Sequence, residues 1–208
     1  VGDAIRRAHE RGAVVAGTSA GASIQSSHLV AFGVGGATPK QRMTQVAAGL
    51  GLVDTAVIDQ HFDQRNRYGR LLMIVAQSPQ LLGIGVDEDT CGLVEDVDGD
   101  FVMRVMGKGA VTVFDGSRMV SNAYEATRSS PLLGSGVVFH TLPEGTVFNL
   151  STRTLLPQEP VIEPEDADEL AEATRDLRQL VRDIAAADAT PAAIRRRLKL
   201  RRTTTRQT

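Results

Sequence analysis

A serine between two glycines is the first feature whose composition suits a reactive site. Residues 17–21 have the sequence Gly-Thr-Ser-Ala-Gly, and the apolar residues 13–16 precede them. This is the G-x-S-x-G pattern of a nucleophile elbow, a sharp turn from a strand into a helix. Small flanking residues permit the strained turn, so that Ser19 projects into a cleft and the N–H of Ala20 is directed at an oxyanion. A glycine-rich turn without chemistry is the alternative explanation.

A nucleophilic serine requires a base, and His61 is the histidine best placed to act as one. It lies in residues 59–63, Asp-Gln-His-Phe-Asp, at the end of a predicted strand. Functional groups gather at the carboxyl ends of strands in open α/β sheets. The other three histidines are expected to be solvated or structural: His9, His28 and His140.

The third member of a triad would be an acid at another strand end. Residues 87–89, Asp-Glu-Asp, directly follow the predicted strand 83–86, and one of these carboxylates could orient His61. Asp59 and Asp63 compete for that role by proximity in the sequence. Three adjacent acids are also typical of a solvated loop, so the sequence leaves the choice open.

Three arginines follow the histidine: Arg65, Arg67 and Arg70. Guanidinium groups beside an active site favour an anionic substrate group such as a carboxylate. Arg67 and Arg70 are three residues apart and share a helix face, whereas Arg65 points elsewhere. The alternative is a charged helix face paired with nearby aspartates.

Two metal sites are conceivable from the spacing of acids. Asp59, His61 and Asp63 could be hard ligands, but no second histidine supports such a site. Residues 96–100 resemble the start of a calcium loop, but Gly107 stands where an EF-hand has its bidentate glutamate. A hairpin turn explains that segment better. We therefore expect neither a metal nor another cofactor.

These residues require an α/β framework to position them. The apolar periodicity predicts helices, strands and a loop in this order: helix 3–11, strand 13–16, helix 22–27, loop 31–39, strand 53–58, helix 64–77 and strand 83–86. Short antiparallel strands then follow over 93–95, 101–105, 110–113, 137–140 and 146–149, with a hairpin turn at Asp98-Gly99. The alternation of the first part favours an α/β fold.

Composition excludes several classes of protein. The 208 residues carry a formal net charge of −2, which argues against a nucleic-acid binder over the whole chain. The single cysteine, Cys91, excludes an internal disulfide and makes a reducing cytoplasm the default location. No apolar run approaches the roughly 18 residues of a membrane-spanning helix. The chain begins at Val1 without a methionine, and we expect a natural N-terminal part before it.

The composition changes near residue 157, which predicts a boundary between a catalytic part, 1–157, and a charged extension, 158–208. Residues 159–172 carry seven acids and no basic residue, and residues 195–206 carry seven basic residues and no acid. A leucine-rich stripe predicts a helix over 165–187, followed by a disordered tail over 203–208. The basic segment could bind an acidic partner or nucleic acid, or it could pair with the acidic segment.

Four segments together are similar to one family. Residues 16–22 (Ala-Gly-Thr-Ser-Ala-Gly-Ala), 49–52 (Gly-Leu-Gly-Leu), 59–72 and 83–90 (Gly-Ile-Gly-Val-Asp-Glu-Asp-Thr) resemble the cyanophycinases. That family is grouped with peptidase E among serine peptidases. The resemblance covers about residues 3–155 and implies a three-layer sandwich of the class I glutamine-amidotransferase-like type, here with added antiparallel strands and a C-terminal helix.

The resemblance implies Ser19 as nucleophile, His61 as base and Glu88 as third member. It also implies a substrate pocket shaped by five residues: Asp59, Gln60, Arg65, Arg67 and Arg70. The family's substrate is cyanophycin, a poly-aspartate with arginine on each side-chain carboxyl, which is cut to β-Asp-Arg dipeptides as by an exopeptidase. The resemblance makes a homodimer plausible. It also implies a region before the elbow that supplies sheet strands and part of the oxyanion hole.

Two related activities are alternatives. A peptidase of the peptidase E type would use the same fold and triad on ordinary aspartyl dipeptides. A glutamine amidotransferase proper is disfavoured, because it needs a cysteine at the elbow and this chain has Ser19. A non-catalytic interaction module with a basic tail is the alternative from another class.

Overall fold

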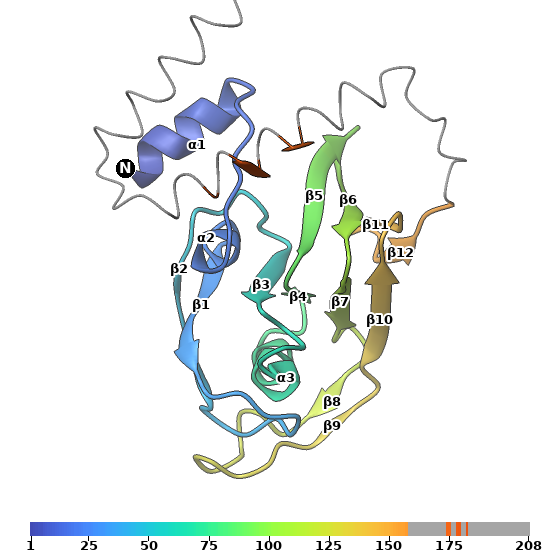
Figure 1. Ribbon diagram of the computed structural model, residues 1–208. Coiled ribbons are helices and arrows are strands. Elements are labelled where there is room, and N and C mark those ends of the chain that lie inside the picture. The colour runs from blue at the N-terminus through green and yellow to red at the C-terminus, as the bar shows by residue number, and fades with distance from the viewer. Residues whose placement is uncertain (158–173, 176–177, 180–181, 183–208) are drawn as a thin grey trace, which may run out of the picture. The chain divides into compact units, whose positions relative to one another are not determined.

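The computed structural model describes residues 1–157, 174–175, 178–179 and 182 (Figure 1). The chain divides into two units, Val1–Glu159 and Pro160–Thr208. The five described residues of the second unit are helical and lie within the predicted helix 165–187. The acidic segment, the basic segment and the predicted tail lie outside the described residues. Among the residues that the structure describes, no helix is long and apolar enough to cross a membrane.

A mixed four-stranded sheet forms the centre of the first unit, in the order β10-β7-β4-β3. Its parallel pair is β3 (Ala56–Gln60) and β4 (Leu82–Val86), and β7 (Ala110–Asp115) and β10 (Val138–Pro143) continue it as antiparallel strands. Parallel neighbours need a crossover connection, which α3 (Tyr68–Gln77) provides. The strand after residue 53 and the helix after His61 are thus present near their predicted positions.

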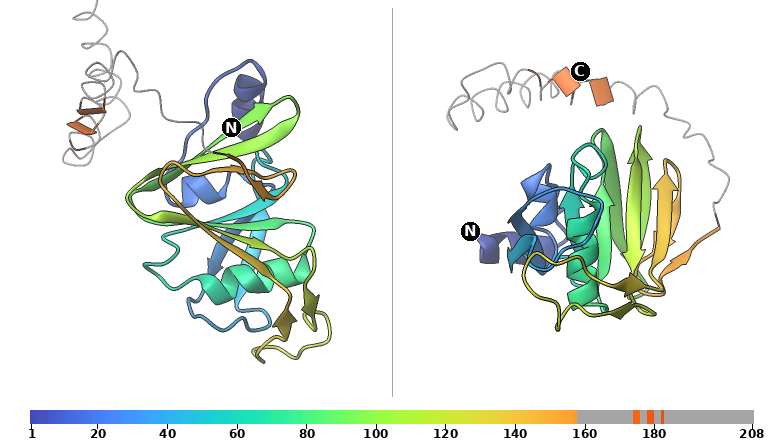
Figure 2. Two further views of the ribbon diagram at one scale, coloured as in Figure 1. Left: turned by 90° about the vertical axis from the view of Figure 1, so that its right-hand side faces the viewer. Right: turned by 90° about the horizontal axis from the view of Figure 1, so that it is seen from below.

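The two faces of this sheet are covered differently (Figure 2). Helix α3 packs on one face, where a Cβ on Gly83 would lie 2.7 Å from the side chain of Val75. On the other face, buried residues of the central sheet share one core with strands of a second, antiparallel sheet. That sheet has the order β12-β11-β6-β5, formed by Thr154–Leu155, Val147–Asn149, Asp100–Gly107 and Thr90–Val97. The fold is therefore mixed α/β, as predicted, but the three-layer glutamine-amidotransferase-like sandwich is not confirmed.

The predicted hairpin at Asp98-Gly99 is confirmed. Val97 of β5 pairs with Asp100 of β6, so Asp98 and Gly99 form the loop, with φ of 54° and 90°. Positive φ at both positions is the type I′ geometry that matches the twist of the strands. The Gly99 N–H donates to Asp96 Oδ1 at 2.8 Å, which uses Asp96 in the turn and gives the calcium alternative no support.

The predicted strand 13–16 is wrong. These residues join α1 (Gly2–Glu10) to α2 (Ala20–Ser23) without strand structure, and Val14 is 88% exposed. A strand is stable only when a neighbour pairs with its backbone, and no described strand lies beside this segment. Helix α2 also begins and ends earlier than the predicted helix 22–27.

Residues 31–39 were expected to form a loop, but the strand β1 (His28–Gly33) extends into them and pairs with β2 (Thr44–Ala48). Most side chains of this ribbon are exposed, so the apolar alternation that signals a strand is weak. Two further short strands, β8 (Val120–Ser121) and β9 (Gly134–Ser135), were also not predicted. They pair with each other at the edge of the unit that Figure 1 shows farthest from α1.

A charged contact joins the loop before β12 to the central sheet. Arg153 donates to the Asp115 carboxylate at the end of β7 and to the carbonyl of Gln80 at 2.6 Å. Burial raises the pKa of Asp115, but hydrogen bonds from Ser117 and Arg153 outweigh it, so the pKa lies below its ordinary value. The charged carboxylate therefore stabilises the fold.

We expect Arg153→Ala to lower the free energy of unfolding by about 1–3 kcal/mol at neutral pH, because it leaves a buried carboxylate poorly paired. The folded-state pKa of Asp115 is lowered, so this contribution is present above the ordinary aspartate pKa and is lost as the pH falls through the folded value. Urea unfolding at neutral and acidic pH measures it, with exposed Arg128→Ala as the matched control. An equal difference at both pH values would contradict the assignment.

Candidate active site

Ser19 lies at the N-terminus of α2 in a strained backbone conformation. Its φ of 53° and ψ of −123° are rare for a residue with a side chain, and such strain is typical of functional sites. The turn also requires glycine at position 17, since a Cβ there would lie 2.1 Å from the carbonyl oxygen of Gly21. Residues 17–21 therefore adopt the tight geometry expected of an elbow, although no strand precedes them.

A chain of hydrogen bonds joins Ser19 to a histidine and an acid. The Ser19 Oγ is 2.9 Å from His61 Nε2, and His61 Nδ1 is 2.8 Å from Glu88 Oε1. With Nδ1–H donating to the carboxylate, Nε2 is free to accept the serine proton. The Gln60 amide oxygen lies farther from Ser19 Oγ, at 3.4 Å. Of the acids that the sequence left open, Glu88 is the one that contacts His61.

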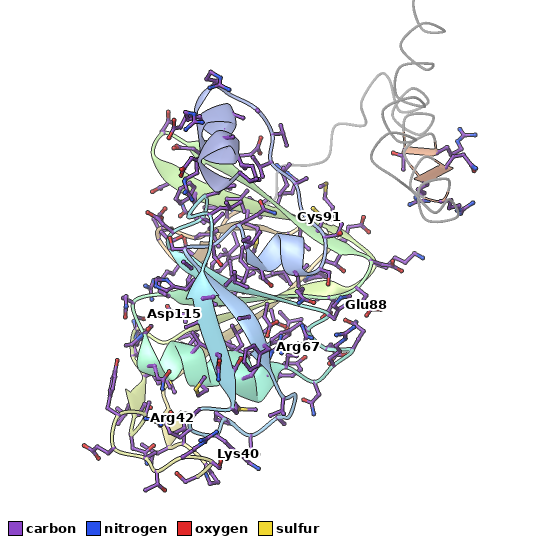
Figure 3. All side chains as sticks on the ribbon, turned by 90° about the vertical axis from the view of Figure 1, so that its left-hand side faces the viewer. Lys40, Arg42, Arg67, Glu88, Cys91 and Asp115 are labelled. Carbon is purple, nitrogen blue, oxygen red and sulfur yellow. The ribbon has the colours of Figure 1, made fainter. Side chains whose placement is uncertain are left out.

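Strand pairing explains why residues so far apart in sequence meet. Gln60 pairs with Val86 at the ends of the parallel strands β3 and β4. His61 and Glu88 follow these two strand ends, and Ser19 hydrogen-bonds to His61 from the start of α2. In Figure 3 the labelled Glu88 and Arg67 lie near α2, and the labelled Lys40 lies apart from them. The side chains expected at the carboxyl strand ends therefore do lie together there.

The backbone at Ala20 offers a hydrogen-bond donor beside Ser19. The neighbouring N–H groups of Gly21 and Ala22 donate to Thr18 and Ser19 carbonyls, each at 2.9 Å. The Ala20 N–H has no acceptor among the described residues, and Ala20 is exposed. A free N–H next to the serine oxygen can donate a hydrogen bond to the oxyanion that develops on a substrate carbonyl.

Beneath the site, Asp59 forms a buried cluster with two arginines. Its carboxylate is completely buried and accepts from Arg70 Nε at 2.6 Å, from a second Arg70 nitrogen and from Arg67 Nη1 at 3.2 Å. The Gln60 N–H also donates to it, at 2.9 Å. The pKa of Arg67 lies below its ordinary value, because burial and the adjacent Arg70 lower it more than Asp59 raises it. Arg70 reaches further to the Gly33 carbonyl of β1, at 3.2 Å.

Three of the five residues expected to shape the substrate pocket belong to this buried cluster. Asp59, Arg67 and Arg70 are buried and bound to one another, so their side chains are engaged in the fold rather than directed at solvent. The alternative of paired charges on a helix describes Arg67 and Arg70 better. These ion pairs also occupy the Asp59 carboxylate, which a metal site of Asp59, His61 and Asp63 would need as a ligand.

Arg65 and Gln60 remain accessible members of the predicted pocket. The predicted helix 64–77 begins only at Tyr68, because residues 61–66 form hydrogen-bonded turns and Asn66 has a φ of 47°. Arg65 therefore lies in a turn, apart from the face of α3, with its side chain exposed. Gln60 is partly buried and faces Ser19.

Sequence reasoning assigned no individual role to Phe62 or Gln64, and it left Asp87 as one of three adjacent acids that could orient His61. Phe62 is fully buried against Gly85, where a Cβ would lie 2.3 Å from its ring. Gln64 and Asp87 accept hydrogen bonds from backbone groups of neighbouring loops. The glycine alternation in residues 83–86 is a signal for the close approach of an aromatic ring. No pattern of residue types signals a side chain that binds a distant backbone.

The model of peptidase family S51 matches residues 1–101. The chain is 42% identical over 144 residues to a cyanophycinase of Trichormus variabilis, an alignment that covers 69% of this chain and 47% of the relative. It is 39% identical over 137 residues to a cyanophycinase of Geminocystis herdmanii, which covers 65% and 49%. The chain spans about half the length of the curated relatives that it matches. The resemblance inferred from the motifs is thus confirmed.

Proposed function

Since residues 1–101 of this chain match the model of peptidase family S51, we propose that the protein is a serine exopeptidase that hydrolyses cyanophycin to β-Asp-Arg dipeptides. The observation that carries the proposal is the hydrogen-bond chain from Ser19 through His61 to Glu88. A nucleophile, a base and an orienting acid in this arrangement support acyl transfer. The similarity to cyanophycinases supports the choice of substrate.

In the first half of the reaction, Ser19 Oγ attacks the scissile carbonyl carbon and its proton passes to His61 Nε2. The developing oxyanion is stabilised by the Ala20 N–H. His61 then delivers the proton to the leaving amine, the C–N bond breaks and an acyl-enzyme remains. A water molecule attacks the ester by the same route, with His61 taking one water proton and returning it to Ser19. Glu88 holds the imidazole and stabilises its charged form.

The accessible charges near the triad suit a substrate with both carboxylates and guanidinium groups. Arg65 is exposed in the turn after His61 and can bind a free carboxylate. Asp63 and Asp89 are exposed carboxylates on the two loops that carry His61 and Glu88, and they can accept from a guanidinium group. The Gln60 amide oxygen lies 3.4 Å from Ser19 Oγ and can contact the substrate beside it. Asp59, Arg67 and Arg70 act beneath the pocket, holding Gln60 and the end of β3.

An aspartyl dipeptidase of the peptidase E type is the alternative, because the same triad would serve it. The two differ in substrate, so we expect the protein to release β-Asp-Arg from cyanophycin and to leave ordinary Asp-X dipeptides intact. Mass spectrometry of both reactions, run side by side with Ser19→Ala as the blank, makes the comparison.

Each outcome of this comparison has a defined meaning. Dipeptide cleavage without release from cyanophycin would favour the alternative. If neither substrate is cut, labelling of Ser19 by an alkyl fluorophosphonate separates the remaining cases. In that reaction the Ser19 Oγ–P bond forms, the P–F bond breaks to release fluoride, and His61 Nε2 takes the serine proton. Labelling would support a serine hydrolase with another substrate, and its absence would favour a non-catalytic module.

A homodimer and a cytoplasmic location belong to the same proposal. Both come from the resemblance and the single cysteine rather than from any contact among the described residues. Sedimentation equilibrium of the protein tests the dimer, and fractionation of the cells that make it tests the location.

A further inference from the structure

Two loops carry the base and the acid of the proposed triad. His61 begins the loop that follows β3, and Glu88 lies in the loop that follows β4. The backbone is strained at both places, since His61 itself has a φ of 47° and Asp89, next to Glu88, has a φ of 54°. Neither loop is part of a helix or strand, so the regular backbone ladder of the sheet does not fix the distance between them.

Each loop supplies a side chain that binds the backbone of the other. Gln64, from the His61 loop, accepts the Glu88 N–H through Oε1 at 3.0 Å. Asp87, from the Glu88 loop, accepts the Asp63 N–H through Oδ1 at 3.0 Å. We call these contacts the two bridging hydrogen bonds. They run in opposite directions between the same two loops that the His61–Glu88 hydrogen bond joins.

Asp87 is itself held in place. Its second oxygen, Oδ2, accepts the Ala110 N–H at the start of β7, at 3.2 Å. One carboxylate therefore joins the His61 loop to a strand of the central sheet. Backbone hydrogen bonds add to this anchor, with Phe62 N–H donating to Val86 at 3.2 Å.

We propose that Gln64 and Asp87 are positioning residues that fix the His61–Glu88 hydrogen bond, an inference that rests on the proposed function. Among the hydrogen bonds of the described residues, none joins either side chain to Ser19 or to a ring nitrogen of His61. They act through the backbone of the residues beside the pair. A catalytic geometry misplaced by about 1 Å can cost about 100-fold in rate, so two contacts of ordinary strength have a large effect on activity.

The exposure of these side chains separates their role from folding. Gln64 is exposed and Asp87 is only partly buried, so neither contributes to the apolar core. Gln64→Met keeps the length of the side chain and removes its acceptor. Asp87→Ala removes both of its acceptor oxygens, and Asp87→Asn keeps one of them. Gln80→Met, on an exposed glutamine after α3, is the matched control.

The test measures two properties of each variant of the protein. One is the rate at which an alkyl fluorophosphonate labels Ser19. The other is the downfield proton resonance of His61 Nδ1–H, which reports its hydrogen bond to Glu88 without any turnover and is assigned with His61→Ala. Thermal unfolding verifies that every variant is folded.

We expect Gln64→Met and Asp87→Ala each to slow labelling by about 10- to 100-fold and to weaken or broaden the His61 resonance. Asp87→Asn should fall between wild type and Asp87→Ala, and Gln80→Met should match wild type. Wild-type resonance and labelling in both acceptor-free variants would overturn the proposal. If wild type itself is not labelled, the proposed function fails, while the resonance still decides whether these residues position the pair.

Discussion

Replacement of Ser19 by alanine is expected to lower hydrolysis of cyanophycin by about 10⁴- to 10⁶-fold, which is the effect of removing a triad nucleophile elsewhere. In the part of the chain that the structure describes, no other hydroxyl hydrogen-bonds to His61 Nε2 and could substitute for it. The Gln60 amide, 3.4 Å from Ser19 Oγ, is not a nucleophile, and His61 would then face a methyl group. Initial rates and covalent labelling by a fluorophosphonate both measure the loss.

The stability of the Ser19→Ala variant should equal that of wild type, since alanine meets the same backbone strain and Ser19 caps no helix N–H with its side chain. Ser19→Gly should be equally inactive but more stable, by up to about 1–3 kcal/mol, because glycine relieves a φ of 53°. Ser135→Ala, on the exposed strand β9, is the control for loss of a hydroxyl. Full activity of Ser19→Ala would remove the whole mechanism.

The positions of Ser19 and His61 could be predicted because local residue types report them. Glycine and serine at fixed spacing specify a turn, and a short apolar run followed by polar residues specifies a strand end. The partner of His61 could not be chosen in the same way, because the registers of β3 and β4 decide which acid meets it. The structure brings Glu88 to Nδ1 and leaves Asp87 to bind backbone groups.

The burial of two of the arginines, by contrast, could not be predicted from the sequence. Positive charges near a reactive histidine suggested contacts with an anionic substrate, but charge alone does not report burial. Arg67, at the N-cap of α3, and Arg70, in its first turn, are buried and donate hydrogen bonds to the Asp59 carboxylate of β3. The apolar run 13–16 failed for a related reason, since a strand also depends on a neighbour that the run itself does not specify. Burial and pairing are properties of the assembled fold.

The buried cluster of Asp59 with Arg67 and Arg70 gives the largest expected effect on stability. Asp59→Ala leaves two guanidinium groups in the interior without their carboxylate, and breaking a buried ion pair in this way costs about 3–5 kcal/mol. Asp59 is completely buried, and Arg67 and Arg70 are 8% and 3% exposed, so water cannot readily replace the lost contacts. Urea unfolding of the variant should show this loss.

Asp59→Asn separates charge from shape. It keeps one carbonyl oxygen for the arginines and for the Gln60 N–H, so we expect a loss smaller than that of Asp59→Ala. Asp54→Ala, on an exposed aspartate five positions earlier, should change the unfolding free energy by less than about 0.5 kcal/mol. If Asp59→Ala is no worse than Asp54→Ala, the cluster does not stabilise the fold.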